Sequence, residues 1–144
     1  MTSAAQLEQI VVVLTAWAER TPSILGLALI GSHARGVARA DSDIDVMVLT
    51  QEPDLFLHSV AWIEDIDWGA AHSSIAGWRD VQYGRVWSRH FRLADGSALE
   101  LSFAEPNWAA VDPLDAGTRD AIAGGFRVLF DREHLLRQLA THAA

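Results

Sequence analysis

Two carboxylates, Asp43 and Asp45, stand one residue apart directly before the apolar run Val46 to Leu49. Residues two apart in a strand share one face and lie about 6.5 Å from each other. Such a pair of negative charges repels itself unless a cation lies between the two groups. Mg²⁺ prefers a few carboxylates completed by waters and phosphate oxygens. The spacing therefore predicts a site for a hard divalent cation at the start of a strand.

A glycine-marked turn, Gly31-Ser32, precedes the carboxylates and directly follows a second apolar run, Ile24 to Ile30. A turn at a helix N-terminus presents unpaired backbone N–H groups, which suit phosphate oxygens. Gly31 lets the backbone approach a ligand closely, and Ser32 adds a hydroxyl. The alternative is an ordinary helix N-cap. Together with the carboxylates, the turn indicates a metal-dependent nucleotide site.

The stretch from Gly31 to Leu49 resembles the signature of the nucleotidyltransferase family with the DNA-polymerase-β-like fold. That signature has three parts in a fixed order, and the matching residues here are Gly31-Ser32, Ala34-Arg35-Gly36 and Ser42-Asp43-Ile44-Asp45. The resemblance implies that Asp43 and Asp45 are catalytic metal ligands. It also implies nucleotide contacts from Gly31, Ser32, Arg35 and Ser42. Arg35 has two further interpretations, a brace for the loop and a solvated helix residue, and the brace is favoured.

A third carboxylate is implied by the same resemblance, because the family takes one from a neighbouring strand later in the chain. Glu100 is the best candidate. It lies on the face opposite Leu99 and Leu101 in the strand expected over 97–103. Glu100 is therefore assigned as the third catalytic and metal-binding residue. The alternative is an exposed charge on the solvent face of a hairpin, with Glu105 as the next candidate ligand.

The reaction implied by the resemblance is Mg²⁺-dependent transfer of a nucleoside monophosphate from a nucleoside triphosphate, with release of pyrophosphate. A two-ion site is expected, and ATP is the default donor. The acceptor is a hydroxyl of a small molecule or of a partner protein. The alternative function is an antitoxin-like or other binding module that uses the same fold with a helical, toxin-like partner and little or no turnover.

Composition excludes several other functions. The 144 residues suffice for one domain spanning 1–144. The formal net charge of −8 argues against nucleic acid as the main ligand. The absence of lysine and cysteine excludes Schiff-base chemistry, disulfides and thiolate metal sites. With no membrane-length apolar run and no signal-peptide pattern at the start, a cytoplasmic location is expected. The oligomeric state stays open.

The order of helical and strand patterns predicts an α+β domain, in which helices pack against a mixed β-sheet. Helices are expected over 4–20, 32–37, 53–66 and 115–122 and after Asp131. Strands are expected over 24–30, 42–50, 71–75, 83–93, 97–103 and 126–130, with a hairpin turn at Asp95-Gly96. The buried side of the helix over 53–66 is predicted to consist of Leu55, Phe56, Val60, Ile63 and Ile66.

Overall fold

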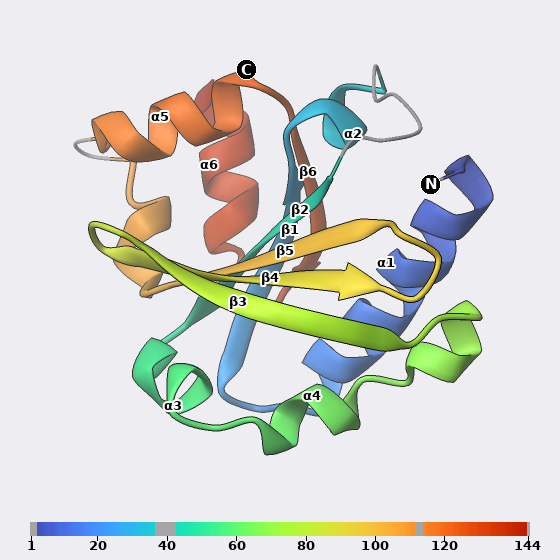
Figure 1. The fold of residues 1–144 in the computed structure, drawn as a ribbon. Helices are drawn as coiled ribbons and strands as arrows, with labels where there is room; N and C mark the ends of the chain where they lie inside the picture. The colour runs from blue at the N-terminus through green and yellow to red at the C-terminus, as the bar shows by residue number, and fades with distance from the viewer. Residues whose placement is uncertain (1–2, 37–42, 112–113, 144) are drawn as a thin grey trace.

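The computed structural model describes residues 3–36, 43–111 and 114–143. Within these residues, six strands form one mixed sheet in the order β3-β4-β5-β2-β1-β6 (Figure 1). The strands are β1 (Ile24–Ile30), β2 (Ile44–Thr50), β3 (Ile75–Tyr83), β4 (Val86–Leu93), β5 (Ala98–Ala104) and β6 (Phe126–Asp131). The helices are α1 (Ala4–Glu19), α2 (Ser32–Arg35), α3 (Pro53–Leu57), α4 (Ala61–Asp65), α5 (Ala116–Ala123) and α6 (Leu135–Ala143). The predicted α+β class is confirmed.

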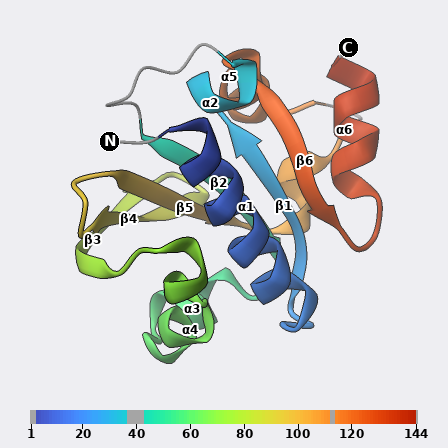
Figure 2. The same ribbon diagram turned by 90° about the vertical axis from the view of Figure 1, so that its right-hand side faces the viewer.

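Helices cover both faces of the sheet (Figures 1 and 2). Each face has its own apolar core. Successive side chains of β2 point to opposite faces, so they belong alternately to the two cores. Val46 and Val48 pack on the side of α1, α3 and α4, whereas Met47 and Leu49 pack on the side of α5 and α6. Asp45 has the same parity as Met47, so it lies on the face that α5 and α6 partly cover.

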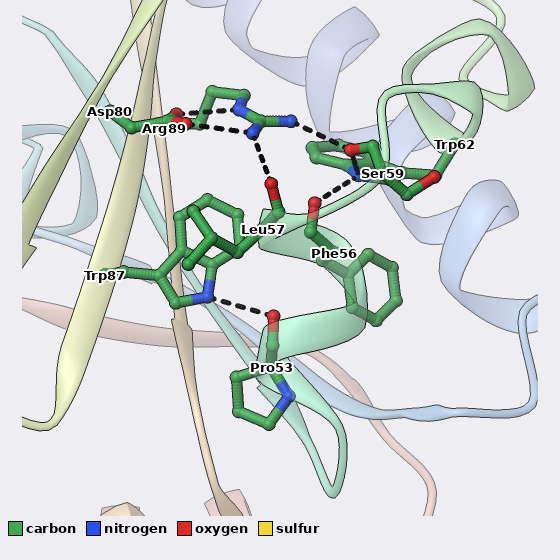
Figure 3. A network of polar contacts seen from close by, with 8 residues as sticks. All are labelled: Pro53, Phe56, Leu57, Ser59, Trp62, Asp80, Trp87 and Arg89. Carbon is green, nitrogen blue, oxygen red and sulfur yellow. Dashed lines mark hydrogen bonds and ion pairs between the residues drawn. The ribbon is translucent and has the colours of Figure 1, made fainter.

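The single helix predicted over 53–66 is wrong, because the segment forms two short helices, α3 and α4, separated at residues 58–60. A buried arginine of β4, Arg89, explains the break (Figure 3). Its guanidinium donates to the carbonyls of Leu57 and Ser59, at 3.2 Å each. The Trp62 indole N–H also donates to the Ser59 carbonyl, at 2.9 Å. The carbonyls of Leu57 and Ser59 therefore accept hydrogen bonds from side chains, and they do not need the backbone donors of a continuous helix.

The predicted buried side of this segment is correct only in part. Phe56 and Ile63 are buried, as is Ile66, which follows α4. Leu55 and Val60 are instead 61% and 56% exposed. The break between the two helices removes the single 3.6-residue period on which the prediction depended.

The strand predicted over 83–93 is also wrong at its start. Tyr83 ends β3, and Gly84 and Arg85 form a turn into β4, so β3 and β4 pair as an antiparallel hairpin. The predicted short strand over 71–75 is replaced by a 3₁₀ turn, Trp68–Ala71, before β3. The hairpin predicted at Asp95-Gly96 is confirmed, since it joins the antiparallel strands β4 and β5.

The C-terminal elements follow the sequence patterns closely. Asp115 caps α5 by accepting from the Thr118 N–H, and Asp131 accepts from the N–H groups of Leu136 and Arg137 in the first turn of α6. In the part of the chain that the structure describes, no helix has both the length and the apolar composition needed to cross a bilayer.

Candidate functional site

The parallel pairing of β2 with β5 brings two predicted site residues together. Asp45 and Glu100 are direct cross-strand partners, and His90 of β4 pairs with Glu100 on its other side. Cross-strand partners point to the same face. His90 Nε2 lies 3.4 Å from Glu100 Oε1. Two carboxylates and an imidazole therefore form a row across three neighbouring strands.

The Asp45 carboxyl is the most perturbed acid of this row. Burial raises its pKa from 3.8 to about 7, and a hydrogen bond with Glu100 and the charges of Glu100 and Asp43 act in the same direction. Two carboxyl groups can share a hydrogen bond only when a proton lies between them. Below about pH 7 the Asp45 carboxyl therefore holds a proton, which offsets the repulsion that a bound cation would otherwise neutralise.

Asp43 occupies a less central position than its spacing predicts. It directly precedes β2, its side chain is exposed, and it influences Asp45 through charge. Among the described residues, no three His, Asp or Glu side chains gather closely enough to hold a metal ion. Asp45 and Glu100 nevertheless fit a hard divalent cation, because two adjacent carboxylates supply the oxygen ligands that Mg²⁺ prefers. Asp43 would have to move toward them to become a third ligand.

The Gly31 turn lies directly against Asp45. A Cβ atom added at Gly31 would come within 2.9 Å of Asp45 Oδ2, and the backbone there has φ +80°. Both observations require glycine at this position. The predicted phosphate-binding turn and the predicted metal ligand are therefore neighbours in space. Ser32 begins α2 beside them and is half-buried.

A second glycine turn supports the first, and the sequence did not single it out for the site. Gly125, which follows α5, accepts a hydrogen bond from the Gly31 N–H at 3.3 Å through its carbonyl. A Cβ at Gly125 would lie 2.5 Å from both the Gly31 carbonyl oxygen and Arg35 Cγ. Arg35 thus packs its aliphatic stem across this turn, which agrees with its interpretation as a brace. The Gly124-Gly125 doublet was the available sequence signal.

His90 is a further residue that sequence reasoning missed. It is one of several polar residues in an alternating strand, and only the pairing register places it beside Glu100. Its Nε2 also lies 3.5 Å from the Tyr83 hydroxyl. No local motif marks such a residue, because its position depends on two hairpins that meet in one sheet.

Two other predicted residues have different outcomes. Ser42 lies outside the described residues, so its predicted nucleotide contact stays a prediction. Glu105, the alternative third carboxylate, lies beyond the end of β5, where Ala104 pairs with Leu49. Asp45 and Glu100 pair at the opposite end of these strands. The register therefore favours Glu100 over Glu105.

Comparison with known proteins bears on the family likeness and on the fold. Residues 10–79 match the family described as "Nucleotidyltransferase domain". An aminoglycoside 6-adenyltransferase from Bacillus subtilis has a similar structure, with a TM-score of 0.52 and 15% identity over 76% of this chain. Cid1 in complex with the UTP analog UMPNPP gives a TM-score of 0.47 and 16% identity over 84% of this chain. No curated protein sequence matches.

The fold is therefore that of the polymerase-β-like nucleotidyltransferases, and residues 10–79 are similar to the nucleotidyltransferase family that the motif predicted. The chain corresponds to 37% of the length of the adenyltransferase and 34% of that of Cid1.

Proposed function

We propose that this chain transfers a nucleoside monophosphate, with ATP as the default donor, to an acceptor hydroxyl in a Mg²⁺-dependent reaction. The observation that supports this most is the contact between the Gly31 turn and Asp45, with Glu100 paired to Asp45. The Gly31 turn, which lets phosphates approach the backbone closely, therefore lies next to carboxylates that suit a cation.

Each residue has a role that follows from its position. Gly31 and Ser32 bind the terminal phosphates, and Gly125 and Arg35 hold that turn in place. Asp45 and Glu100 would hold Mg²⁺, and Asp43 would join them by moving toward the ion. Bound Mg²⁺ would neutralise charge on the triphosphate during transfer. Glu100, supported by His90, is also the group best placed to accept a proton from the acceptor hydroxyl.

The transfer is a substitution at the α-phosphorus of the donor. The acceptor oxygen forms a bond to this phosphorus, and the bond from phosphorus to the bridging oxygen of the β-phosphate breaks. The electron pair of the broken bond leaves with pyrophosphate. The hydroxyl proton passes to Glu100 or to water, so that the products are the nucleotidylated acceptor and pyrophosphate.

Calorimetric titration with a non-hydrolysable ATP analogue and Mg²⁺ tests the binding part of the proposal. The wild-type chain is expected to bind, and Asp45→Asn is expected to lose most of this affinity while remaining folded. Glu64→Gln is the matched control, because Glu64 is an exposed acid of α4 outside the site. Equal binding by wild type and Asp45→Asn would contradict the metal site.

Glu100→Gln separates binding from chemistry. Its amide keeps the size of the side chain but cannot accept the hydroxyl proton. The affinity for the nucleotide is expected to fall less than the rate of pyrophosphate release. A coupled phosphate assay measures this rate in the presence of an acceptor that the wild-type chain uses. Unchanged release would remove Glu100 from the proposed chemistry.

A further inference from the structure

A hollow of about 490 Å³ lies beside Asp43 and His90, along the β3–β4 hairpin and the start of β5. Its charged and titratable lining consists of Asp43, His90 and Arg92 of β4, and Arg79 of β3. Its size is that of a small-molecule pocket. The hollow therefore adjoins the proposed reaction site, and its two arginines have no role assigned above.

A glycine on the edge strand β3, which has no side chain, makes room for this hollow. Gly77 of β3 pairs with Arg92, and the register of β3 against β4 shifts between Ile75 and Gly77. Arg92 Nη2 would lie 3.5 Å from a Cβ placed at Gly77. The arginine side chain thus extends over the glycine, along the sheet face, toward the hollow.

The two arginines share one face and lie close together. Arg79 pairs with His90 and therefore points to the same side as Glu100, and Arg92 has the same parity along β4. Diagonal neighbours in an antiparallel pair are about 7–8 Å apart. Both side chains are exposed, and no ion pair joins either of them to another of the described residues. One phosphate or carboxylate group can bridge two such guanidinium groups.

The charge of the hollow changes when the proposed metal ions bind. Asp43 is its one carboxylate among the described lining residues, and this group belongs to the proposed metal site. The remaining formal charges are those of Arg79 and Arg92. A polycation such as an aminoglycoside would be repelled here, whereas an anion would be attracted.

We propose that this hollow is the acceptor site and that the acceptor is a small molecule with a phosphate or carboxylate group, which Arg79 and Arg92 bind. The proposal rests on the function proposed above and adds the substrate class. Neighbouring strands lie about 4.8 Å apart, so Arg79 is two strands, or about 10 Å, from Glu100. A compact hydroxyl-bearing anion held by the long arginine side chains can therefore place its hydroxyl beside Glu100.

NMR titration of the ¹⁵N-labelled chain tests this site with inorganic phosphate and, separately, acetate. Saturable shifts are expected at Gly77 and at the side chains of Arg79 and Arg92, and the stronger anion identifies the acceptor group. Arg79→Gln and Arg92→Gln should each weaken the affinity about tenfold, since each removes charge-assisted hydrogen bonds. Arg137→Gln on α6 is the control, because its exposed side chain lies outside the hollow. Kanamycin should produce no saturable shifts in the hollow.

The same titration is repeated with Mg²⁺ and the non-hydrolysable ATP analogue present. Anion binding that persists beside the bound nucleotide supports an acceptor site. Displacement of the anion would assign the arginines to the donor triphosphate and overturn the proposal, as would the absence of saturable anion shifts or equal affinity in the variants. Nucleotide binding is followed separately at Gly31. Its loss with anion binding intact would therefore contradict the proposed function and not the anion site.

Discussion

Gly31 combines two constraints that a single substitution tests. Its backbone has φ +80°, and a Cβ there would collide with Asp45 Oδ2. Gly31→Ala is expected to destabilise the fold by about 1–3 kcal/mol from backbone strain alone, with additional loss of Mg²⁺–nucleotide binding from the collision. Thermal unfolding and calorimetry measure the two effects.

Gly84→Ala is the matched control for this experiment. Gly84 has φ +59° in the turn between β3 and β4, and a Cβ there would meet no atom within 4 Å. The control variant should lose about 1–2 kcal/mol of stability but keep nucleotide binding. Equal binding by the Gly31→Ala variant and its control would show that the turn does not contact the ligand.

Asp45 predicts an unusual dependence of stability on pH. Its folded pKa of about 7 lies above its ordinary value of 3.8, so the folded state holds a proton that the unfolded state releases. This contribution to stability is complete below about pH 4 and is lost as the pH rises to about 7. The slope is at most ~1.4 kcal/mol per pH unit.

Urea unfolding in EDTA between pH 4.5 and 8 measures this effect as the difference between wild type and Asp45→Asn. The variant should be more stable than wild type at pH 8, and this advantage should shrink toward pH 4.5. Added Mg²⁺ should stabilise wild type most at high pH, where the carboxylates are ionised. A difference that stays constant with pH would contradict the raised pKa of Asp45.

At the scale of the elements, Arg89 joins the β3–β4 hairpin to the α3–α4 segment. Its guanidinium pairs with Asp80 at 2.7 Å and lies near the rings of Trp62 and Trp87 (Figure 3). The ring of Trp78 also lies close to it. The side chain is only 2% exposed. Because residues alternate along β4, this anchor on one face fixes His90 and Arg92 on the other.

Removal of the Asp80 carboxylate should therefore destabilise the domain strongly. Asp80→Ala leaves the buried Arg89 charge unpaired, with an expected loss of about 3 kcal/mol in the free energy of unfolding. Arg127→Ala is the comparison, since its ion pair with Glu8 is exposed and should contribute less than about 1 kcal/mol. Chemical denaturation measures both variants. Similar losses would show that Arg89 is not an important anchor.

The sequence predicted those elements and contacts that depend on local signals. The β1 strand, the Gly31 turn and the carboxylates of β2 follow one another within a short stretch, and apolar runs mark their limits. The break between α3 and α4 depends on Arg89, which lies about 30 residues later in the chain. The positions of His90 and Arg79 likewise depend on strand register. Such long-range pairings leave no periodic signal in the segments that they reshape.

At the scale of the whole molecule, the net charge of −8 predicts weak interaction with nucleic acid. Phosphate backbones bind through many basic contacts, and the cationic site that the described residues form at Arg79 and Arg92 is small. Fluorescence anisotropy with a labelled single-stranded RNA should show no binding at about 0.15 M salt. Binding that weakens steeply with added salt would instead indicate an extended basic surface.

Because β2 pairs directly with β5, residues 51–97 form a long connection between the two strands that bear Asp45 and Glu100. The β3–β4 hairpin lies at the free edge of the sheet, with β3 outermost. During evolution, the exposed residues of this hairpin can therefore diverge while β2 and β5 keep their register. Homologues with different acceptors would then share the Gly31 turn and the carboxylates of β2 and β5. They would differ at the positions of Gly77, Arg79 and Arg92. The β3–β4 hairpin is the part of the molecule where natural selection can change specificity without rebuilding the proposed reaction centre.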